Sequence, residues 1–223
     1  PLTPIQLSAE RLQHKLVNKL DETDARILKR ATTTIVDQVE ALKKMVNEFR
    51  DYARAPELEF YQIDLNRLIR EVLALYQTTT HPENSAIYPQ IDMQLAADIP
   101  PIKGDPARLR QVLHNLLQNS QDALSTIHDP MIRVQTESSK SNILLSITDN
   151  GIGLSESVEA NIFEPYITTK PKGTGLGLPI VKKIIDEHGG TILVKNIQPH
   201  GAQVFITLPA LVIENSQHPD IPV

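Results

Sequence analysis

The sequence predicts an α+β protein in which an N-terminal helical hairpin precedes an α/β sandwich. In residues 1–55, apolar side chains recur at alternating spacings of three and four, as in helices that pack along a seam. Residues 60–209 alternate short apolar runs with amphipathic stretches, which favours a mixed sheet with helices on one face. Residues 210–223 contain Asn215, Ser216, Pro219, Asp220 and Pro222, and we expect a disordered tail there.

The composition indicates an aliphatic core and excludes several classes of function. Of 223 residues, 40% are hydrophobic but only 4% are aromatic. The 22 basic and 27 acidic residues give a net charge of -5, so we expect no nucleic-acid partner. Cysteine is absent, which excludes disulfides, thiolate metal sites and a cysteine nucleophile. No apolar run approaches the roughly 20 residues that a membrane-spanning helix needs.

Residues 1–55 are expected to form two helices separated by a polar break, with Asp21 or Thr23 capping the second helix. A lone hairpin leaves half of its seam exposed, so we expect two copies to form a four-helix bundle. Packing of the hairpin on its own domain is the alternative. The seam residues are Leu2, Ile5, Ala9, Leu12 and Leu16, followed by Leu28, Thr32, Ile35, Val39, Leu42, Val46, Phe49 and Ala53.

A second domain is expected after a helix break at residues 54–57, where Pro56 disfavours helical geometry. Asp64 and Asp105-Pro106 are helix starts, and the second of these helices is predicted to run to about Ile127. A third helix is predicted from Leu178 to Glu187, ended by a pair of glycines. Strands are predicted at 86–95, 131–137, 142–149, 191–197 and 202–208, the last two forming a hairpin.

Three motifs in this second domain carry chemistry. The first is a polar stripe on the helix that begins at Pro106, where Asn115, Asn119 and Asp122 share one face. Carboxamide oxygens suit Mg²⁺, which prefers oxygen ligands and commonly also binds substrate phosphates. The alternative for the stripe alone is that the asparagines only face solvent or form hydrogen bonds with nearby loops.

The second motif is Asp149-Asn150-Gly151-Ile152-Gly153, which follows an apolar strand. A carboxylate at the end of a strand, opening a glycine turn, can accept a hydrogen bond from an adenine amino group. The alternative is an ordinary turn, because Asp-Asn-Gly is a common turn sequence.

The third motif is a glycine-rich segment, residues 168–178, that runs into a helix. It contains Lys170 and the sequence Gly173-Thr174-Gly175-Leu176-Gly177-Leu178. Backbone amides at a helix N-terminus can hold phosphate oxygens, to which Thr174 and Lys170 would add a hydroxyl and a charge. A flexible surface loop is the alternative for this segment alone. All three motifs together predict a nucleotide site, although neither the P-loop nor the G-x-G-x-x-G spacing is present.

Together these motifs resemble the ATP-binding region of sensor histidine kinases. Residues 115–119 resemble the N box, 149–153 the first glycine box, 162–166 the F box and 173–178 the second glycine box. The first two helices resemble the family's dimerisation and phosphotransfer hairpin. Residues 1–12 look most like the nitrogen-regulation sensors of the NtrY type.

The resemblance implies the ATP-binding sandwich shared with HSP90 and gyrase, with ATP and Mg²⁺ as cofactors. It implies that Asn119, helped by Asn115, holds Mg²⁺ and phosphates, that Asp149 reads adenine, and that residues 155–177 form a mobile lid. The implied ATP contacts are Asn115, Asn119, Asp122, Asp149, Gly151, Gly153, Tyr166, Thr169, Lys170, Gly173, Thr174, Gly175, Leu176, Gly177 and Leu178.

Two positions depart from the family pattern. The accepting histidine of the family precedes a proline that matches Pro1, so we expect it just upstream of this chain. The chain alone is therefore expected to bind ATP without phosphorylating itself. Many relatives also carry a basic residue where this sequence has Asp122, and Lys170 or Arg108 can compensate.

The resemblance further implies a protein-histidine kinase that passes phosphate to an aspartate of a response regulator, expected to be NtrX-like. It implies a homodimer through the N-terminal helices and the cytoplasmic portion of an inner-membrane-anchored bacterial sensor, with the membrane reached only through upstream segments. Two alternatives stay open. One is a nucleotide-binding dimerisation module without turnover. The other is a gyrase- or HSP90-type ATPase, which Asn115 disfavours because hydrolysing relatives carry glutamate there.

Overall fold

A computed structural model describes residues 2–53, 58–78, 89–139, 141–168, 170 and 173–211. The chain divides into two compact units, each described by itself below. One comprises residues 1–55 and 168–176, and the other comprises residues 56–167 and 177–223. The predicted break at 54–57 and most of the predicted tail, 212–223, lie outside the described residues.

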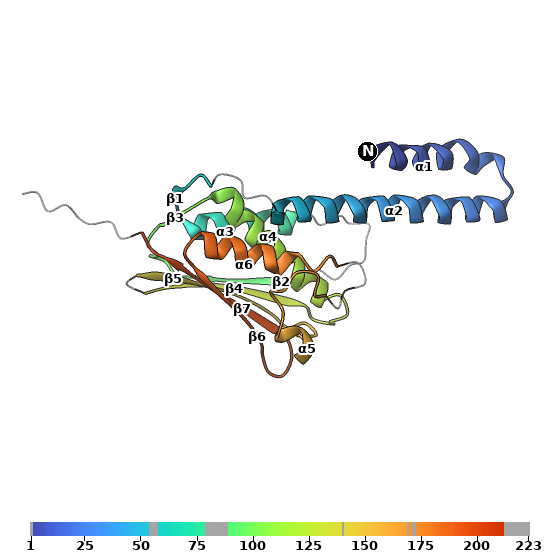
Figure 1. Ribbon diagram of the computed structural model, residues 1–223. Coiled ribbons are helices and arrows are strands. Elements are labelled where there is room, and N and C mark those ends of the chain that lie inside the picture. Colours follow the sequence, from blue (N-terminus) through green and yellow to red (C-terminus); the bar gives the residue numbers. More distant parts are fainter. Residues whose placement is uncertain are drawn as a thin grey trace, which may run out of the picture. The chain divides into compact units, whose positions relative to one another are not determined.

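The first unit contains the predicted helical hairpin, with α1 (Thr3–Leu16) folding back along α2 (Glu22–Ala53) (Figure 1). A short 3₁₀ turn, Val17–Lys19, follows α1. Asp21 rather than Thr23 caps α2, because its Oδ1 accepts a hydrogen bond from the amide of Asp24 at 2.9 Å. The two helices are joined by side chains, as where Thr32 Oγ1 donates to Gln13 Oε1 at 3.0 Å.

The predicted apolar seam separates into two rows within this hairpin. Ala9, Thr32 and Val39 are buried between the two helices. The neighbouring row stays exposed, with Ile35 at 42% and Leu42 at 45% of full exposure. Ile5, Leu12, Val46 and Phe49 are exposed as well. One hairpin therefore buries only three residues of the seam that the spacing predicts.

The second unit is built on a five-stranded mixed sheet in the order β2-β4-β5-β7-β6 (Figure 1). β2 pairs in parallel with β4, and the other pairs are antiparallel. The predicted strands are confirmed, except that residues 86–88 lie outside the described part of the chain. The strand bounds are β2 Gln90–Leu95, β4 Met131–Ser138, β5 Asn142–Asp149, β6 Thr191–Asn196 and β7 Ala202–Pro209.

A two-stranded sheet was not predicted. β1 (Tyr61–Ile63) pairs antiparallel with β3 (Ile102–Gly104), and three residues per strand are too few to show an alternating pattern. Beyond β7, the amide of Ala210 donates to Ser141 O and that of Leu211 to Pro101 O. Ala210 and Leu211, at the start of the expected tail, are therefore hydrogen-bonded to the rest of the second unit.

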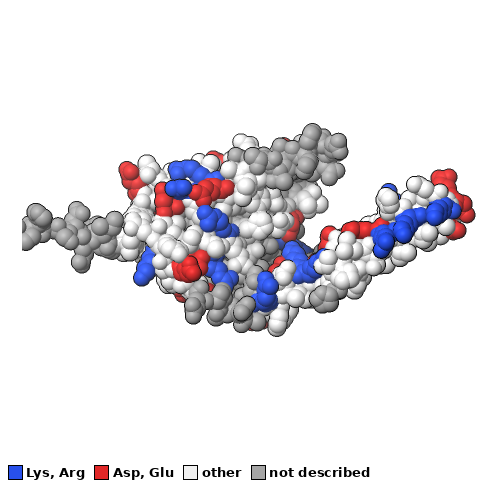
Figure 2. Space-filling model, turned by 90° about the horizontal axis from the view of Figure 1, so that it is seen from above, with Lys and Arg blue, Asp and Glu red and all other residues white. Residues whose placement is uncertain are grey.

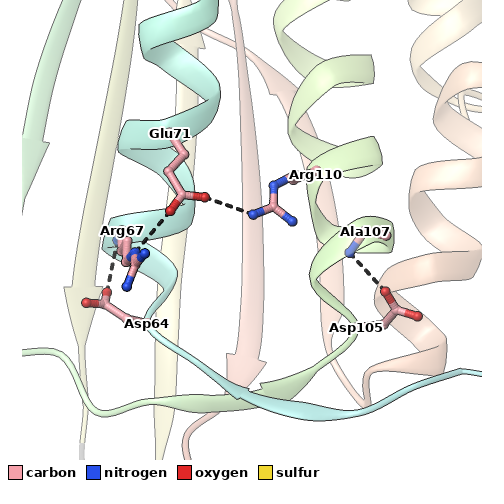
Figure 3. Close-up of polar contacts among 6 residues, drawn as sticks. All are labelled: Asp64, Arg67, Glu71, Asp105, Ala107 and Arg110. Atoms are coloured by element: carbon pink, nitrogen blue, oxygen red, sulfur yellow. Dashed lines mark hydrogen bonds and ion pairs between the residues drawn. The ribbon is translucent and has the colours of Figure 1, made fainter.

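Three helices cover one face of the large sheet: α3 (Leu65–Thr78), α4 (Pro106–Ala123) and α6 (Gly177–Glu187) (Figure 1). Both predicted caps are present (Figure 3): Asp64 Oδ1 accepts from the amide of Arg67, and Asp105 Oδ1 from that of Ala107, each at 2.9 Å. The prediction that α4 reaches Ile127 is wrong. The helix ends at Ala123, and the amide of Leu124 closes its last turn on the carbonyls of Ser120 and Gln121.

Polar contacts fix α3 against α4 and against the sheet. Glu71 on α3 bridges Arg110 and Arg67 (Figure 3), and hydrogen bonds from Arg110 and then Arg67 lower the pKa of Glu71. Burial raises the pKa of Tyr76 to about 12, and its hydroxyl forms a hydrogen bond with His114 Nδ1 at 2.6 Å. The buried Asn66 donates to Ala96 O and accepts from Thr136 Oγ1, each at 2.8 Å.

A short helix, α5 (Glu156–Glu159), was not predicted.

Charged side chains of both signs lie close together over the visible α/β unit (Figure 2). This surface fits the weakly acidic composition and offers no broad basic face in that view. Within the described residues, no helix combines the length and apolar character needed to cross a bilayer.

Candidate functional site

The carboxamide pair of α4 lies beside the first turn of α6. Leu113, Leu116 and Leu117 are buried, so α4 presents Asn115 and Asn119 from a neighbouring, partly buried face. Asn115 Nδ2 donates to the carbonyl of Gly177 at 3.5 Å. A side chain at Gly177 would begin 3.9 Å from Asn119 Nδ2. The structure therefore brings together three of the predicted residues, although Gly177 lies 62 positions after Asn115 in the chain.

The first turn of α6 adds a site for negative charge. Its leading residues, Gly177 and Leu178, are partly buried, and α6 runs for 11 residues. The unpaired amides of a helix N-terminus carry partial positive charge and point at whatever lies in front of them. Two carboxamides beside such an N-terminus suit the oxygens of a phosphate chain.

Asp122 lies one turn beyond the carboxamide pair on α4. It is exposed, and its Oδ1 accepts a hydrogen bond from Gln118 Nε2 at 2.9 Å. The helical stripe predicted from the sequence is thus present, but its third member also interacts along the helix surface.

Asp149 lies at the end of β5 with only 7% of its surface exposed. Its Oδ1 accepts from the amides of Gly151 at 3.0 Å and Ala202 at 3.4 Å. Its Oδ2 accepts from Ser120 Oγ, on α4, at 3.2 Å. The carboxylate is therefore held by donors from three elements. One of these donors, Ser120, directly follows Asn119 in α4.

Close approach requires the glycines of the first cluster. A Cβ on Gly151 would lie 2.8 Å from the carbonyl oxygen and from Cβ of Ala123, at the end of α4. Gly153 has φ +71° and would place a Cβ 2.8 Å from Asn196 Oδ1. The loop after β5 therefore packs tightly on both α4 and β6.

Residues from β6 and the turn after it hold this loop, and sequence reasoning missed them. Asn196 accepts from the amide of Leu154 at 2.8 Å and donates to its carbonyl at 2.9 Å. Gly201 approaches so closely that a Cβ there would lie 2.1 Å from Asp149 O. His200-Gly201 carries a turn signal in the sequence, but no local signal identifies Asn196 or Ser120 as part of the site.

Most of the second glycine cluster belongs to the unit that contains the hairpin. The amide of Gly173 donates to Lys170 O at 3.0 Å, and Gly175 has φ +70°. Thr174 Oγ1 accepts from the amide of Leu176 and hydrogen-bonds to Glu48 Oε2. Leu176 is buried. Among the other predicted contacts of this region, Thr169 lies outside the described residues.

Tyr166, also predicted, lies in the second unit and is 64% exposed. Its φ of +67° is unusual for a side chain of this size and is a form of backbone strain that concentrates at functional sites.

A pocket of about 280 Å³ lies at the other end of α4 and α6. It contains none of the residues predicted to bind nucleotide. Its lining residues are Phe60, Lys103, Glu187, His188, Pro209, Ala210 and Leu211.

The chain is similar to known proteins. Residues 104–212 match the family described as histidine kinase-, DNA gyrase B- and HSP90-like ATPase. The nitrogen regulation protein NtrY of Azorhizobium caulinodans is 36% identical over 219 residues. The match covers 94% of this chain but 27% of NtrY, so the chain spans only part of that relative.

Solved structures of two further relatives share the fold. A nucleotide-free catalytic domain of the histidine kinase ThkA is 33% identical with a TM-score of 0.59, covering 68% of this chain and 98% of that domain. ThkA in complex with the response regulator TrrA is 28% identical with a TM-score of 0.67, covering 94% and 58%. Full-length ShkA in complex with AMPPNP is 25% identical with a TM-score of 0.67, covering 82% and 39%.

The glycine geometry makes a prediction about stability. Gly153→Ala should lower the free energy of unfolding by more than about 1 kcal/mol, because the site has positive φ and no room for a Cβ. Gly177→Ala is the matched control. Its Cβ would make only an ordinary contact, and alanine favours the helix, so stability should stay level or rise. Urea unfolding of both variants checks this. Equal losses at both positions would contradict the proposed tight packing of the first loop.

Proposed function

Because this chain belongs to the sensor histidine kinases and carries their catalytic region, we propose that it binds Mg²⁺-ATP for transfer of the γ-phosphoryl group to a histidine and then to a response-regulator aspartate. One observation carries the proposal. Helix α4 places Asn115 and Asn119 beside the N-terminus of α6. The next residue, Ser120, donates a hydrogen bond to the buried carboxylate of Asp149. Such a site has separate places for phosphates and for a base.

Asp149 would bind the adenine. Its carboxylate is buried and held by donors from three elements, so it can accept a hydrogen bond from the exocyclic amino group at little cost in ordering. The glycines on either side of Ile152 let the loop beside this carboxylate pack against α4 and β6. In support, ShkA was crystallised with the ATP analogue AMPPNP.

Asn119, helped by Asn115, would hold Mg²⁺ together with the phosphates. The donor set fits, because carboxamide oxygens are suitable ligands and Mg²⁺ usually completes its shell with waters and substrate phosphates. The described residues contain no cluster of three or more histidine or acidic ligands that would hold a metal without the nucleotide. When bound, the ion would neutralise charge on the phosphates.

The α6 N-terminus and the second glycine cluster would bind the phosphate chain. Gly177 and Leu178 start the helix, and its amides favour anions. Residues 173–176 would close over the phosphates with backbone amides, and Thr174, Thr169 and Lys170 would add hydroxyls and a charge. Thr174 would then exchange its hydrogen bond to Glu48 for one to the nucleotide.

The chemistry is a displacement in which the chain positions its reactants. The bond between the γ-phosphorus and the β,γ-bridging oxygen breaks, a bond to an imidazole nitrogen forms, ADP leaves and the imidazole loses a proton. The phosphoryl group then moves to a carboxylate oxygen. Such transfers depend mostly on alignment and charge neutralisation.

The motif match predicts that the accepting histidine precedes Pro1. Membrane anchoring through upstream segments is likewise a prediction.

The exposed row of the hairpin supports a homodimer. Ile5 and Leu12 on α1, with Ile35, Leu42 and Phe49 on α2, are large apolar side chains left in water. A second copy would cover them in a four-helix bundle. A response regulator, NtrX-like by the similarity to NtrY, is the expected partner, since ThkA was crystallised with one.

Asp149→Asn tests the adenine role. The variant should bind Mg²⁺-ADP at least about tenfold more weakly in calorimetry, because a charged acceptor with buried donors is lost. Asp98→Asn, at an exposed position, should bind as the wild type does. Unchanged affinity of Asp149→Asn would refute the assignment.

Removal of the metal tests the role of Asn119. ADP should bind more weakly when the same titration is done in EDTA, and equal affinity with and without metal would count against Asn119 as a ligand.

Label transfer separates the kinase from an inert binding module. We expect the chain, mixed with γ-labelled ATP and the intact protein carrying Asp149→Asn, to label the intact protein's histidine after subunit exchange. The wild-type intact protein serves as control and should label itself whether transfer occurs within one chain or between chains. No acid-labile label on the wild-type protein would contradict phosphoryl transfer.

Sedimentation tests the dimer. Ile35→Glu combined with Leu42→Glu should give monomers, because both positions belong to the exposed row. Thr33→Glu is the control, since two residues rotate the side chain about 200° around α2 to the far side. Val39 is unsuitable because it is buried inside the hairpin itself. A dimer that survives the double substitution would rule out the proposed bundle.

A further inference from the structure

We propose that Ser120 is a positioning residue that orients the Asp149 carboxylate for adenine, and that its hydroxyl thereby favours adenine over guanine nucleotides. The inference rests on the proposed function, because it assumes that Asp149 contacts the base. Ser120 is not among the residues predicted to contact ATP. It lies in α4 directly after Asn119, on the side that faces the sheet.

The burial of Ser120 shows that its hydroxyl has a specific partner. Only 5% of the residue is exposed, and its Oγ donates to Asp149 Oδ2 at 3.2 Å. A hydroxyl buried among apolar side chains is unfavourable unless it forms a hydrogen bond. Its neighbours Leu116 and Leu117 are each 1% exposed. The polar atom therefore serves the carboxylate rather than the packing of α4.

The carboxylate needs such a partner because its final torsion is soft. Rotation about the bond to a carboxylate has broad minima, so packing of the side chain alone does not set the plane of the two oxygens. The amides of Gly151 and Ala202 both bind Oδ1, and the second bond is long at 3.4 Å. Ser120 binds Oδ2. With a donor on each oxygen from a different element, the plane is determined.

The orientation of an acceptor selects between the two purines. Adenine carries an amino donor at position 6, whereas guanine carries a carbonyl acceptor there. A carboxylate fixed toward that position gains a hydrogen bond with adenine and faces an oxygen with guanine. A carboxylate free to turn would lose much of the first effect and relieve part of the second. Loss of the Ser120 donor should therefore weaken adenine binding more than guanine binding.

Calorimetry with Mg²⁺-ADP and Mg²⁺-GDP on this chain tests the proposal. Ser120→Ala should weaken ADP binding about tenfold, the effect of one hydrogen bond to a charged group, with GDP changed less than about twofold. Ser125→Ala is the matched control. Ser125 is exposed just beyond the end of α4 and donates to the carbonyl of Asp122 at 2.9 Å, so both affinities should equal those of the wild type.

A double-mutant cycle shows whether Ser120 acts through Asp149. In an Asp149→Asn background, Ser120→Ala should cause little further loss of ADP affinity, because the group it orients is already altered. Ser120→Cys keeps the shape of the side chain, with a larger atom that is a weaker donor, and should give an intermediate loss. It also replaces Ser120→Ala as the test if that variant does not fold, as judged by its melting temperature.

Three results would overturn the inference: ADP affinity unchanged in both Ser120 variants, equal losses for ADP and GDP, or the same loss with and without Asp149. In each case the wild type still binds ADP, and the proposed function survives. A wild-type chain that binds no adenine nucleotide would overturn the proposed function and this inference together.

Discussion

The packing of α4 between α6 and the loop after β5 is the constraint on which the candidate site depends. Its apolar face is buried on the sheet, which fixes the rotation of the helix about its axis. That rotation turns Asn115 and Asn119 toward the first turn of α6 and Ser120 toward Asp149. One helix thus sets the spacing between the proposed phosphate and base positions. Displacing α4 from the sheet would therefore disrupt the proposed phosphate position and the proposed base position together.

The first glycine loop is held by contacts from residues outside it. Ala123 closes on Gly151, Asn196 binds both backbone groups of Leu154, and Gly201 meets the carbonyl of Asp149. These contacts come from α4, β6 and the turn before β7. In the second cluster, the amides of Lys170 and Leu176 donate to the hydroxyls of Thr168 and Thr174, and Thr174 also hydrogen-bonds to Glu48. This difference fits the proposal that the base site is fixed and that the phosphate-binding segment changes partners.

Local signals in the sequence are strong where one residue type solves a local problem. Asp64, Asp105 and Asp21 cap helices, and the heptad spacing identifies both helices of the hairpin. The glycine clusters identify the loops because glycine alone tolerates their φ values and close approaches. The division of the seam into a buried and an exposed row was not predictable, since it depends on which side of α2 faces α1. Asn196 and Gly201 reach the site across 42 or more positions, and no local pattern reports such contacts.

The most direct measurement is a crystal structure of this chain with Mg²⁺ and a non-hydrolysable ATP analogue. We expect the adenine amino group at the Asp149 carboxylate, the phosphates between the carboxamide pair and the first turn of α6, and the ion on Asn119. An analogue bound elsewhere, for example in the pocket beside His188 and Phe60, would contradict it.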